Sequence, residues 1–323
     1  MSHFNFIITC HNSEVVGQAI RGALNAGDWK HPVLCVLDAP SEEVRATFKR
    51  AREVVPHLVS SIETDNVHEL LAVNAGLRAS LQREDGYNII VQDDVILDEP
   101  RLTELIEKLY AAVPKLGYVS LRLAVDYAHD DGTRAFMAEM HNLESIYGAG
   151  CTTEYLEPYA FAYRAMPIKS PVCLPCRLVR EVGLFNEELA PYAYDDAEYS
   201  LRAMAAGFVN GLFSVPLFSD YRWGGTRKPG HPDILPIAQR NTSYIRNRWQ
   251  GVINQRAAIH SADVARRDQR IQIAACGEEQ RARALEQWRS SQKLLADVEH
   301  GVIKLGSDAG NRASEMLHKN QGF

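Results

Sequence analysis

The sequence predicts an α/β fold with a mostly parallel central sheet, flanked by helices, and a C-terminal helical extension. Apolar, β-branched runs alternate with helical patterns four times in about the first hundred residues, which is typical of a parallel sheet covered on both faces. Polar residues directly follow several of these runs, where ligands of such sheets bind. From about residue 251 the composition shifts to Ala, Gln, Arg and Glu, which indicates helices.

The elements follow in order along the chain. The first strand is expected to end in a polar turn at residues 10–13, before a helix with apolar spacing. Ser41 is placed to cap the second helix, because a serine oxygen accepts hydrogen bonds from the first helical N–H groups. In full, the pattern predicts strands at 4–9, 32–37, 58–62 and 87–91, and helices at 15–24, 41–54, 68–81, 100–113, 177–182 and 195–206.

Composition narrows the class of protein. Of the 323 residues, 46% are hydrophobic and 24% are charged, so the chain can bury a core without disulfides, and its six scattered cysteines are expected to be reduced. A formal net charge of −6 argues against a nucleic-acid partner, because binding nucleic acid favours a basic face. The sequence shows no signal-peptide pattern and no apolar run of about 18 residues, so we expect a cytoplasmic protein.

Two adjacent carboxylates, Asp93 and Asp94, directly follow the fourth predicted strand. Two adjacent carboxylates repel each other, and burying them requires a counter-charge. Mg²⁺ or Mn²⁺ would meet this requirement, because both ions prefer oxygen ligands and also bind substrate phosphates. The alternative interpretation is an N-capping aspartate beside a solvated neighbour.

A second acidic pair lies about one hundred residues downstream, in the segment YDDAE at 194–198, between GLFNE at 183–187 and Arg202. These segments resemble the signature of the large inverting family-2 glycosyltransferases of the GT-A fold. The upstream motifs of that family have counterparts in the same order, and the resemblance covers about residues 4–250. The counterparts are TCHN at 9–12, LDAPS at 37–41, NAGL at 74–77 and QDDV at 92–95.

The resemblance implies a metal-dependent enzyme that transfers a single sugar from a nucleotide-sugar donor and inverts its anomeric configuration. Matching the motifs residue by residue implies that Asp196 is the general base and that Asp94 binds Mg²⁺ or Mn²⁺, with Asp220 or His231 as a further ligand. The alternative for the second acidic pair is stabilisation of a helix N-terminus. The residues implied to contact the donor are Thr9, Asn12, Asp38, Asn74, Asp93, Arg222 and Arg227.

The sequence departs from the family pattern at two positions. Gln92 stands where the first acid of the D-x-D region is expected, and Val73 stands where an arginine often precedes the asparagine. The nucleotide of the sugar donor therefore stays open among UDP, GDP and dTDP. The segment 221–228 contains two glycines and is predicted to close over the diphosphate, with a plain surface loop as the alternative. Phosphate contacts are expected from Arg78, Arg222, Arg227 or Lys228.

By the same resemblance, residues 1–250 form the glycosyltransferase domain, with a nucleotide-binding half over 1–98 and an acceptor half over 99–250. Residues 251–323 form a helical tail, whose apolar stripe is expected to pack on the body or to form a homo-oligomer. The acceptor is expected to be a glycan or a lipid-linked molecule, with peripheral association at the inner face of the membrane left open. The stripe consists of Leu285, Trp288, Leu295, Val298 and Val302.

Two other functions remain open. A nucleotidyltransferase that makes the nucleotide sugar would share the sheet and the acidic metal site. It would also need a glycine- and lysine-rich phosphate loop after the first strand, and residues 10–13 do not provide one. A non-catalytic sugar-nucleotide-binding scaffold would bind the donor without turning it over.

Two further patterns are interpreted as structural. Glu198 and Arg202 are four residues apart on a predicted helix and are expected to form an ion pair. Cys173 and Cys176 form a lone C-x-x-C without a partner pair, which does not favour a zinc or redox site.

Overall fold

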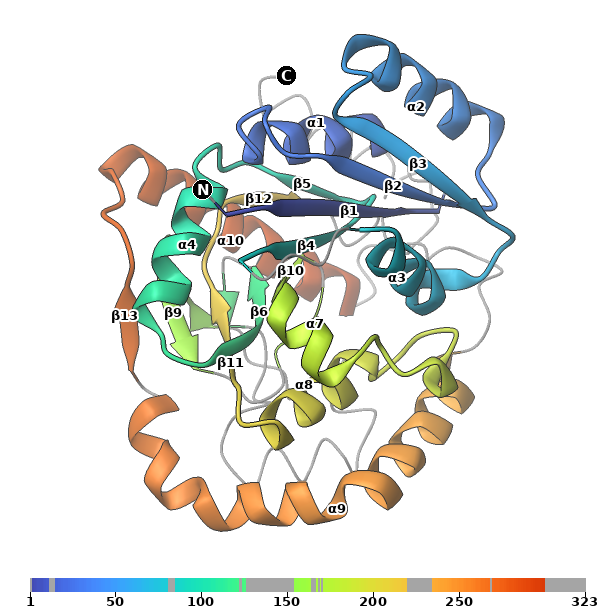
Figure 1. Cartoon of the computed structure of the whole chain (residues 1–323). Coiled ribbons are helices and arrows are strands. Elements are labelled where there is room, and N and C mark those ends of the chain that lie inside the picture. Colours follow the sequence, from blue (N-terminus) through green and yellow to red (C-terminus); the bar gives the residue numbers. More distant parts are fainter. Residues whose placement is uncertain are drawn as a thin grey trace.

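Strands and helices alternate through the N-terminal third of the chain, as predicted (Figure 1). In this computed structural model the described residues are 2–11, 15–80, 85–121, 124–125, 154–163, 167, 169, 171–219, 234–267 and 269–299. Ser41 accepts a hydrogen bond from the Val44 N–H and caps the second helix, also as predicted. The N-terminal elements are β1 (Phe4–Cys10), α1 (Val16–Ala26), β2 (Val33–Asp38), α2 (Glu42–Val54), β3 (Val59–Thr64), α3 (His68–Ala79), β4 (Tyr87–Gln92), β5 (Val95–Leu97) and α4 (Leu102–Ala112).

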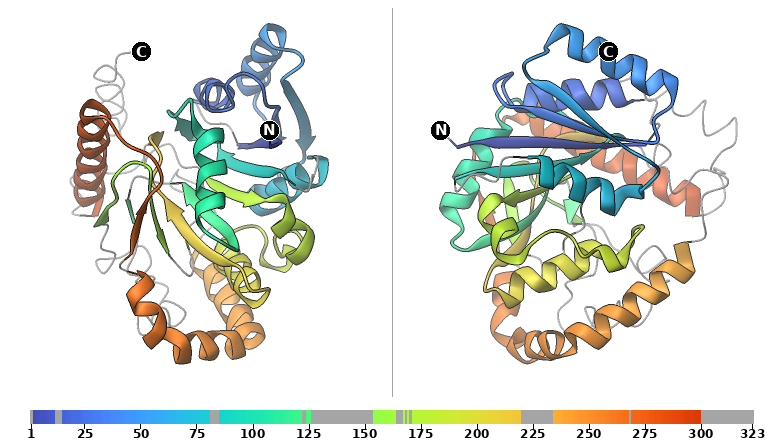
Figure 2. Two further views of the ribbon diagram at one scale, coloured as in Figure 1. Left: turned by 60° about the vertical axis from the view of Figure 1, so that its left-hand side comes forward. Right: turned by 45° about the vertical axis from the view of Figure 1, so that its right-hand side comes forward.

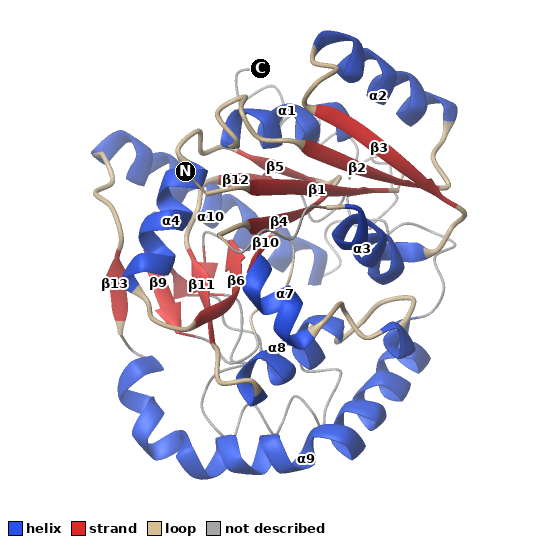
Figure 3. Cartoon of the chain, viewed as in Figure 1, coloured by secondary structure: helices blue, strands red, loops and turns tan. Residues whose placement is uncertain are grey.

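The rest of the described chain adds further strands, the helices α7 and α8, and two long helices, α9 and α10 (Figure 3). Its elements are β6 (Leu116–Leu121), β7 (Ala124–Val125), β8 (Glu154–Tyr155), β9 (Ala160–Tyr163), β10 (Val172–Pro175), α7 (Cys176–Val182), a 3-10 turn η2 (Glu187–Leu189), α8 (Asp195–Ala205), β11 (Val209–Phe213), β12 (Leu217–Ser219), α9 (Ile234–Arg267), β13 (Arg270–Gln272) and α10 (Glu278–Glu299).

One large sheet contains nine of the described strands, in the order β13-β9-β11-β6-β10-β4-β1-β2-β3. The pairs β1–β2, β1–β4, β2–β3 and β6–β11 are parallel. Strand β10 is antiparallel to both of its neighbours, and so is β9. Seven of the nine strands therefore run in one direction and two run against it, which confirms the mostly parallel sheet.

Helices cover both faces of this sheet (Figure 2). Alternate residues of β1 point to opposite faces: Phe6 and Ile8 pack with α1, α2 and α4, whereas Ile7 packs with α3, α7 and α8. Gly76 of α3 allows a close approach, because a Cβ at this position would lie 2.4 Å from Ile7 Cγ2. This contact gives the glycine of the NAGL motif a packing role and brings α3 down onto the first strand.

The described residues of the C-terminal region include segments that pack on the body. Strand β13 extends the sheet beside β9, and the rings of Tyr155 and Trp288 lie 5.6 Å apart. Helix α9 packs against α8 and begins at residue 234, so it runs without a break across residue 250, where we expected the tail to start. Among the described helices, none combines the length and apolar character needed to cross a membrane.

Candidate active site

Two strand ends meet at the acidic turn after β4. Thr9 and Gln92 are register partners at the carboxyl ends of β1 and β4. The Asp93 N–H donates to the Thr9 carbonyl at 3.1 Å, and the His11 N–H donates to Asp93 Oδ2 at 2.6 Å. Asp93 and Asp94 are 8% and 9% exposed, in a turn that leads into β5 rather than into a helix. This acidic pair is therefore neither a helix cap nor a solvated surface pair.

Asp38, at the end of β2, holds the start of α3. Its Oδ1 accepts hydrogen bonds from the Thr64 hydroxyl at 2.8 Å and the Val67 N–H at 2.7 Å, and its Oδ2 accepts one from the His68 N–H at 2.8 Å. Because the N-cap of α3 makes no side-chain hydrogen bond, Asp38 satisfies the first N–H groups from a neighbouring strand. His11 Nδ1 lies 3.2 Å from the Asp38 carbonyl oxygen, so the ends of β1, β2 and β4 converge. Contact between Asp38 and a donor stays a prediction.

The second acidic pair opens α8, and its two members have different surroundings. Asp195 is 2% exposed and its Oδ2 is ion-paired with the Lys169 ammonium. Asp196 is half-buried: its Oδ1 accepts from the Ala197 N–H at 2.8 Å and its Oδ2 from the Lys169 N–H at 3.3 Å. Asp195 is thus committed to an ion pair, whereas the Asp196 carboxylate accepts backbone hydrogen bonds in a residue that is only partly buried.

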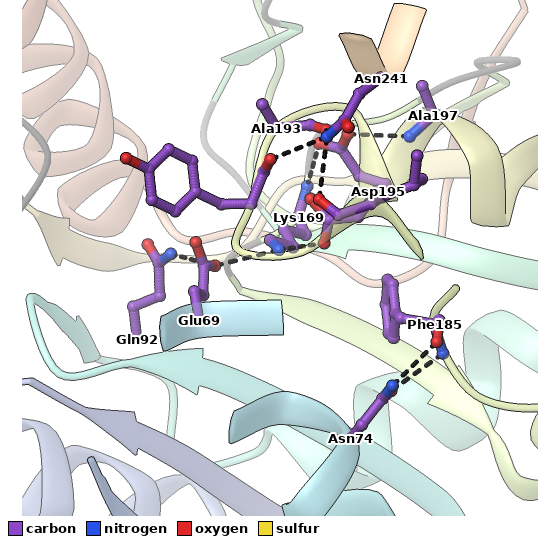
Figure 4. Close-up of polar contacts among 12 residues, drawn as sticks. Glu69, Asn74, Gln92, Lys169, Phe185, Ala193, Asp195, Ala197 and Asn241 are labelled. Atoms are coloured by element: carbon purple, nitrogen blue, oxygen red, sulfur yellow. Dashed lines mark hydrogen bonds and ion pairs between the residues drawn. The ribbon is translucent and has the colours of Figure 1, made fainter. Parts of the chain in front are cut away.

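Polar contacts connect Gln92, the residue before the first acidic pair, with Asp195 of the second pair (Figure 4). Gln92 Nε2 donates to Glu69 Oε1, and the same oxygen lies 3.2 Å from the Lys169 ammonium, which pairs with Asp195. Because Gln92 immediately precedes Asp93, these contacts bring the acids of α8 to the end of the sheet where the β4 turn lies.

These contacts also explain the glutamine at position 92. Glu69 Oε1 accepts a hydrogen bond from the Gln92 amide. An aspartate at this position would place a second negative charge beside Glu69, and like charges in a partly buried site are unfavourable. A neutral donor is therefore compatible with Glu69 where an acid is not.

The balance of burial and charge sets the protonation of this cluster. Burial and then the Asp195 carboxylate raise the pKa of Asp196 above its ordinary value, while Lys169 acts in the opposite direction. Burial alone would lower the pKa of Lys169, but the carboxylates of Asp195, Glu69 and Asp196 outweigh it and raise that pKa. Lys169 is therefore charged at neutral pH, and Asp196 is a stronger base than an exposed aspartate.

Asn74 of α3 holds the segment before α8 in place. It is fully buried; its Nδ2 donates to the Phe185 carbonyl at 2.8 Å, and its Oδ1 accepts from the Phe185 N–H at 2.9 Å. Its Nδ2 also lies 3.1 Å from Glu187 Oε1, which pairs with Arg78. These contacts give Asn74 and Arg78 structural roles. Contact between Asn74 and the sugar donor stays a prediction. The ion pair of Arg78 with Glu187 does not support the expected phosphate contact of Arg78.

Arg202 holds the other end of the same segment. It is ion-paired with Glu198 at 2.9 Å, which confirms the predicted pair, and its guanidinium donates to the carbonyls of Val182 at 2.6 Å and Leu184 at 2.8 Å. Trp249 Nε1 of α9 donates to Glu198 at 3.2 Å. Helix α8 is therefore fixed to both α7 and α9.

Asn241 of α9 fixes the loop that leads into α8. Ala193 and Tyr194 have φ angles of 78° and 63°, in the left-handed region that non-glycine residues rarely adopt. The fully buried Asn241 Nδ2 lies within hydrogen-bond distance of the carbonyls of Leu189 at 2.9 Å, Tyr192 at 3.0 Å and Ala193 at 2.8 Å. This one amide compensates for the unusual backbone that presents Asp195 and Asp196.

The oxygen atoms at the β4 turn suit a hard divalent cation, because Asp93 and Asp94 offer carboxylate oxygens withdrawn from water. In the part of the chain that the structure describes, no group of three or more His, Cys, Asp or Glu side chains is arranged to hold a metal. Five predicted site residues lie outside the described residues: Asn12, Asp220, Arg222, Arg227 and His231. The segment 221–228 lies outside them as well.

Cys173 and Cys176 are structural thiols. Both are fully buried, and Asn88 Nδ2 donates to Cys176 Sγ at 3.5 Å. Burial raises the pKa of Cys173 well above its ordinary value, which keeps this thiol protonated and unreactive. This agrees with the interpretation of the lone C-x-x-C.

Sequence reasoning missed Lys169, Glu69 and Asn241. Lys169 falls in an irregular, aromatic-rich stretch without periodicity, and its acidic partners are about 26 and 100 residues away. Glu69 has the appearance of an ordinary first-turn acid of α3. For Asn241, a polar residue at a fully buried helical position is a signal only once the helix and its buried face are known.

Comparison with known proteins gives similarities of fold alone. No protein-family model and no curated protein sequence matches the chain. The structure aligns with S. aureus TarS at 11% identity and a TM-score of 0.47, covering 75% of this chain and 39% of TarS. It aligns with TarS 1–349 at 13% identity and a TM-score of 0.42, covering 68% and 58%. TarS 1–349 in complex with UDP-GlcNAc gives 13% identity and a TM-score of 0.41, covering 68% and 56%.

Proposed function

We propose that this chain is a glycosyltransferase that moves a single sugar from a nucleotide-sugar donor to a hydroxyl of a glycan or lipid-linked acceptor. The observation that carries this proposal is the set of contacts from Gln92 through Glu69 and Lys169 to Asp195. These contacts bring the acids of α8 to the end of the sheet where the acids of the β4 turn lie. A transferase of this kind needs a base and a diphosphate site at one location.

In the proposed reaction Asp196 accepts the proton of the acceptor hydroxyl. The hydroxyl oxygen forms a bond to the anomeric carbon of the sugar, and the bond from that carbon to the diphosphate oxygen breaks. Attack opposite the leaving group inverts the anomeric configuration. A positioned base of this type typically contributes about 10²- to 10⁴-fold to the rate. The raised pKa of Asp196 favours this role over Asp195, which is held in an ion pair.

The donor is proposed to lie across the ends of β1, β2 and β4, beside Thr9, Asp38 and Asp93. Asp94, with Asp220 or His231, would hold Mg²⁺ or Mn²⁺. When bound, such an ion neutralises charge on the leaving diphosphate. The donor phosphates are proposed to contact Arg222 and Arg227. Asn12 is proposed to contact the same donor.

The test compares wild type with Asp196→Asn in two measurements. Donor binding is measured by thermal shift with UDP-GlcNAc and other UDP-, GDP- and dTDP-sugars, with and without Mn²⁺. Turnover is measured as release of nucleoside diphosphate, alone and with a mixture of saccharide acceptors. We expect Asp196→Asn to bind the donor like wild type and to lose about 10²-fold or more of the turnover. Glu188→Gln, at an exposed acid nearby, is the control and should behave as wild type.

The same measurements separate the alternatives. A scaffold protein would bind a donor in wild type without releasing nucleoside diphosphate under any condition. A nucleotidyltransferase would instead consume a nucleoside triphosphate and a sugar phosphate and release pyrophosphate. Unchanged turnover in Asp196→Asn would remove this residue from the mechanism.

A further inference from the structure

Lys169 is a buried lysine whose ammonium is shared by carboxylates from two elements. It is 9% exposed; its Nζ lies 3.2 Å from Glu69 Oε1 of α3 and is ion-paired with Asp195 Oδ2 of α8. A buried charge is unfavourable unless opposite charges and hydrogen bonds compensate for its lost hydration. The position of Lys169 therefore depends on α3 and α8 at the same time, and it links the two helices.

The main chain of Lys169 reaches the proposed base as well. The Lys169 N–H donates to Asp196 Oδ2 at 3.3 Å, while Oδ1 of the same carboxylate accepts from the Ala197 N–H. Both oxygens of Asp196 are therefore held by backbone donors, one from its own helix and one from residue 169. A displacement of Lys169 would move one of these two supports.

The charges around Asp196 act in opposite directions. Asp195 opposes ionisation of Asp196, and Lys169 favours it. Glu69 lies behind Lys169, and Glu198, the remaining acid in the first turn of α8, bonds to Arg202 and to α9. From α9 the neutral Asn241 contacts the loop before Asp195. Apart from burial, the strongest influences on Asp196 are therefore the opposing charges of Asp195 and Lys169.

We propose that Lys169 is a positioning residue for the general base: held by Glu69 and Asp195, it fixes the Asp196 carboxylate through its backbone N–H and keeps it ionised for proton transfer. Through the Glu69–Gln92 contact the same residue ties the base to the acidic turn after β4. This inference rests on the proposed glycosyl transfer, because it assigns Lys169 a role in supporting the proton acceptor.

The test is the acidic limb of the pH profile of kcat/KM, which reports the protonation of the base in the uncomplexed enzyme. Removing the positive charge in Lys169→Gln should move this limb to higher pH, and removing the negative charge in Asp195→Asn should move it to lower pH. A charge beside a carboxyl shifts its pKa by roughly one to three units. Below the limb, Lys169→Gln should therefore lose about tenfold or more in kcat/KM.

The double variant K169Q/D195N provides the rescue. It removes one positive and one negative charge, so its acidic limb should return toward that of wild type, which a purely structural role for Lys169 does not predict. Asp195→Asn and the double variant differ only at residue 169, so their comparison gives the same answer if Lys169→Gln alone fails to fold. Lys30→Gln, which removes an exposed surface lysine, should leave the profile unchanged.

A second measurement does not depend on turnover. The ¹³C signal of the Asp196 carboxyl, assigned by its absence in Asp196→Asn, is followed against pH in the same variants. If this titration moves in opposite directions in Lys169→Gln and Asp195→Asn, the control of Asp196 by Lys169 is supported, even if no donor is turned over and the proposed transfer fails. Coincident titrations and coincident acidic limbs in all variants would overturn the role of Lys169, even if wild type is an active transferase.

Discussion

The His11 N–H donates a 2.6 Å hydrogen bond to Asp93 Oδ2, which joins the residue after β1 to the first acid after β4. One oxygen of Asp93 is therefore occupied within the protein. Asp94 is the residue that we propose as the principal carboxylate ligand of the metal. The two adjacent acids are thus expected to respond differently to substitution.

Asp94→Asn should abolish the part of donor binding that depends on Mn²⁺. In wild type, a donor with metal at about 100 times its dissociation constant should stabilise the fold by about 2.7 kcal/mol, measured as a thermal shift. The variant should show the same small shift with and without Mn²⁺. Asp28→Asn, at an exposed acid, should respond as wild type. A full metal-dependent shift in Asp94→Asn would remove this residue from the metal site.

Asp196→Asn should make the metal-free protein more stable at neutral pH. The folded-state pKa of Asp196 is raised above its ordinary value of 3.8, so the folded state binds this proton more tightly than the unfolded state. Stability contributed by the protonated form is present at low pH and is lost as pH rises through the window between 3.8 and the raised value. An amide does not ionise and avoids this loss.

Thermal unfolding in excess chelator checks this pH dependence. The variant should have a higher Tm than wild type at pH 7, and the difference should shrink as the pH approaches 3.8. Glu188→Gln, at an exposed acid, again serves as the control. A variant that is less stable than wild type at pH 7 would contradict the direction of the shift.

Asn74→Ala should destabilise the fold more than it weakens donor binding. The substitution leaves the buried N–H and C=O of Phe185 without their side-chain partner, at about 1–3 kcal/mol for each unsatisfied group. Urea unfolding measures the loss of stability, and donor titration of the folded fraction measures binding. Asn25→Ala, at a partly buried helical position, should cost much less. Lost donor affinity at full stability would instead support the contact implied by the family resemblance.

Gly76→Ala should destabilise the fold by overpacking. The added Cβ would lie 2.4 Å from Ile7 Cγ2 and 3.1 Å from Val36 Cγ2, and such insertions typically cost about 1–3 kcal/mol. Gly251→Ala is the matched control, because nothing lies within 4 Å of its added Cβ. It should stabilise α9 by up to about 1 kcal/mol. Equal effects of both substitutions in urea unfolding would show that close packing at residue 76 is unimportant.

The sequence predicted the elements whose causes are local. The alternation of apolar strands with helices from β1 to β4, the Ser41 cap and the Glu198–Arg202 pair depend on residues a few positions apart. The structure confirms all three. The role of Asn74 was not predictable in the same way, because its partner Phe185 lies 111 residues away. Lys169 was missed for the same reason, because its partners Glu69 of α3 and Asp195 of α8 are distant from it in the sequence.

The C-terminal region shows a similar limit. A shift in composition near residue 251 suggested a boundary, but composition does not record that the helix before it starts at residue 234. The short strand β13 has three residues, and it is held by pairing with β9 rather than by a strong pattern of its own. Tertiary pairing therefore accounts for β13.

The contacts of Asn241 bear on how the chain can be shortened for experiments. Its single amide reaches three carbonyls of the loop before Asp195, and it belongs to α9, far along the chain from that loop. A truncated protein that retains every acid of both pairs but stops before residue 241 would lose the contact that holds the left-handed bend at residues 193–194. Loss of activity in such a fragment would then report a relaxed loop, and the shortest informative version has to continue beyond Asn241.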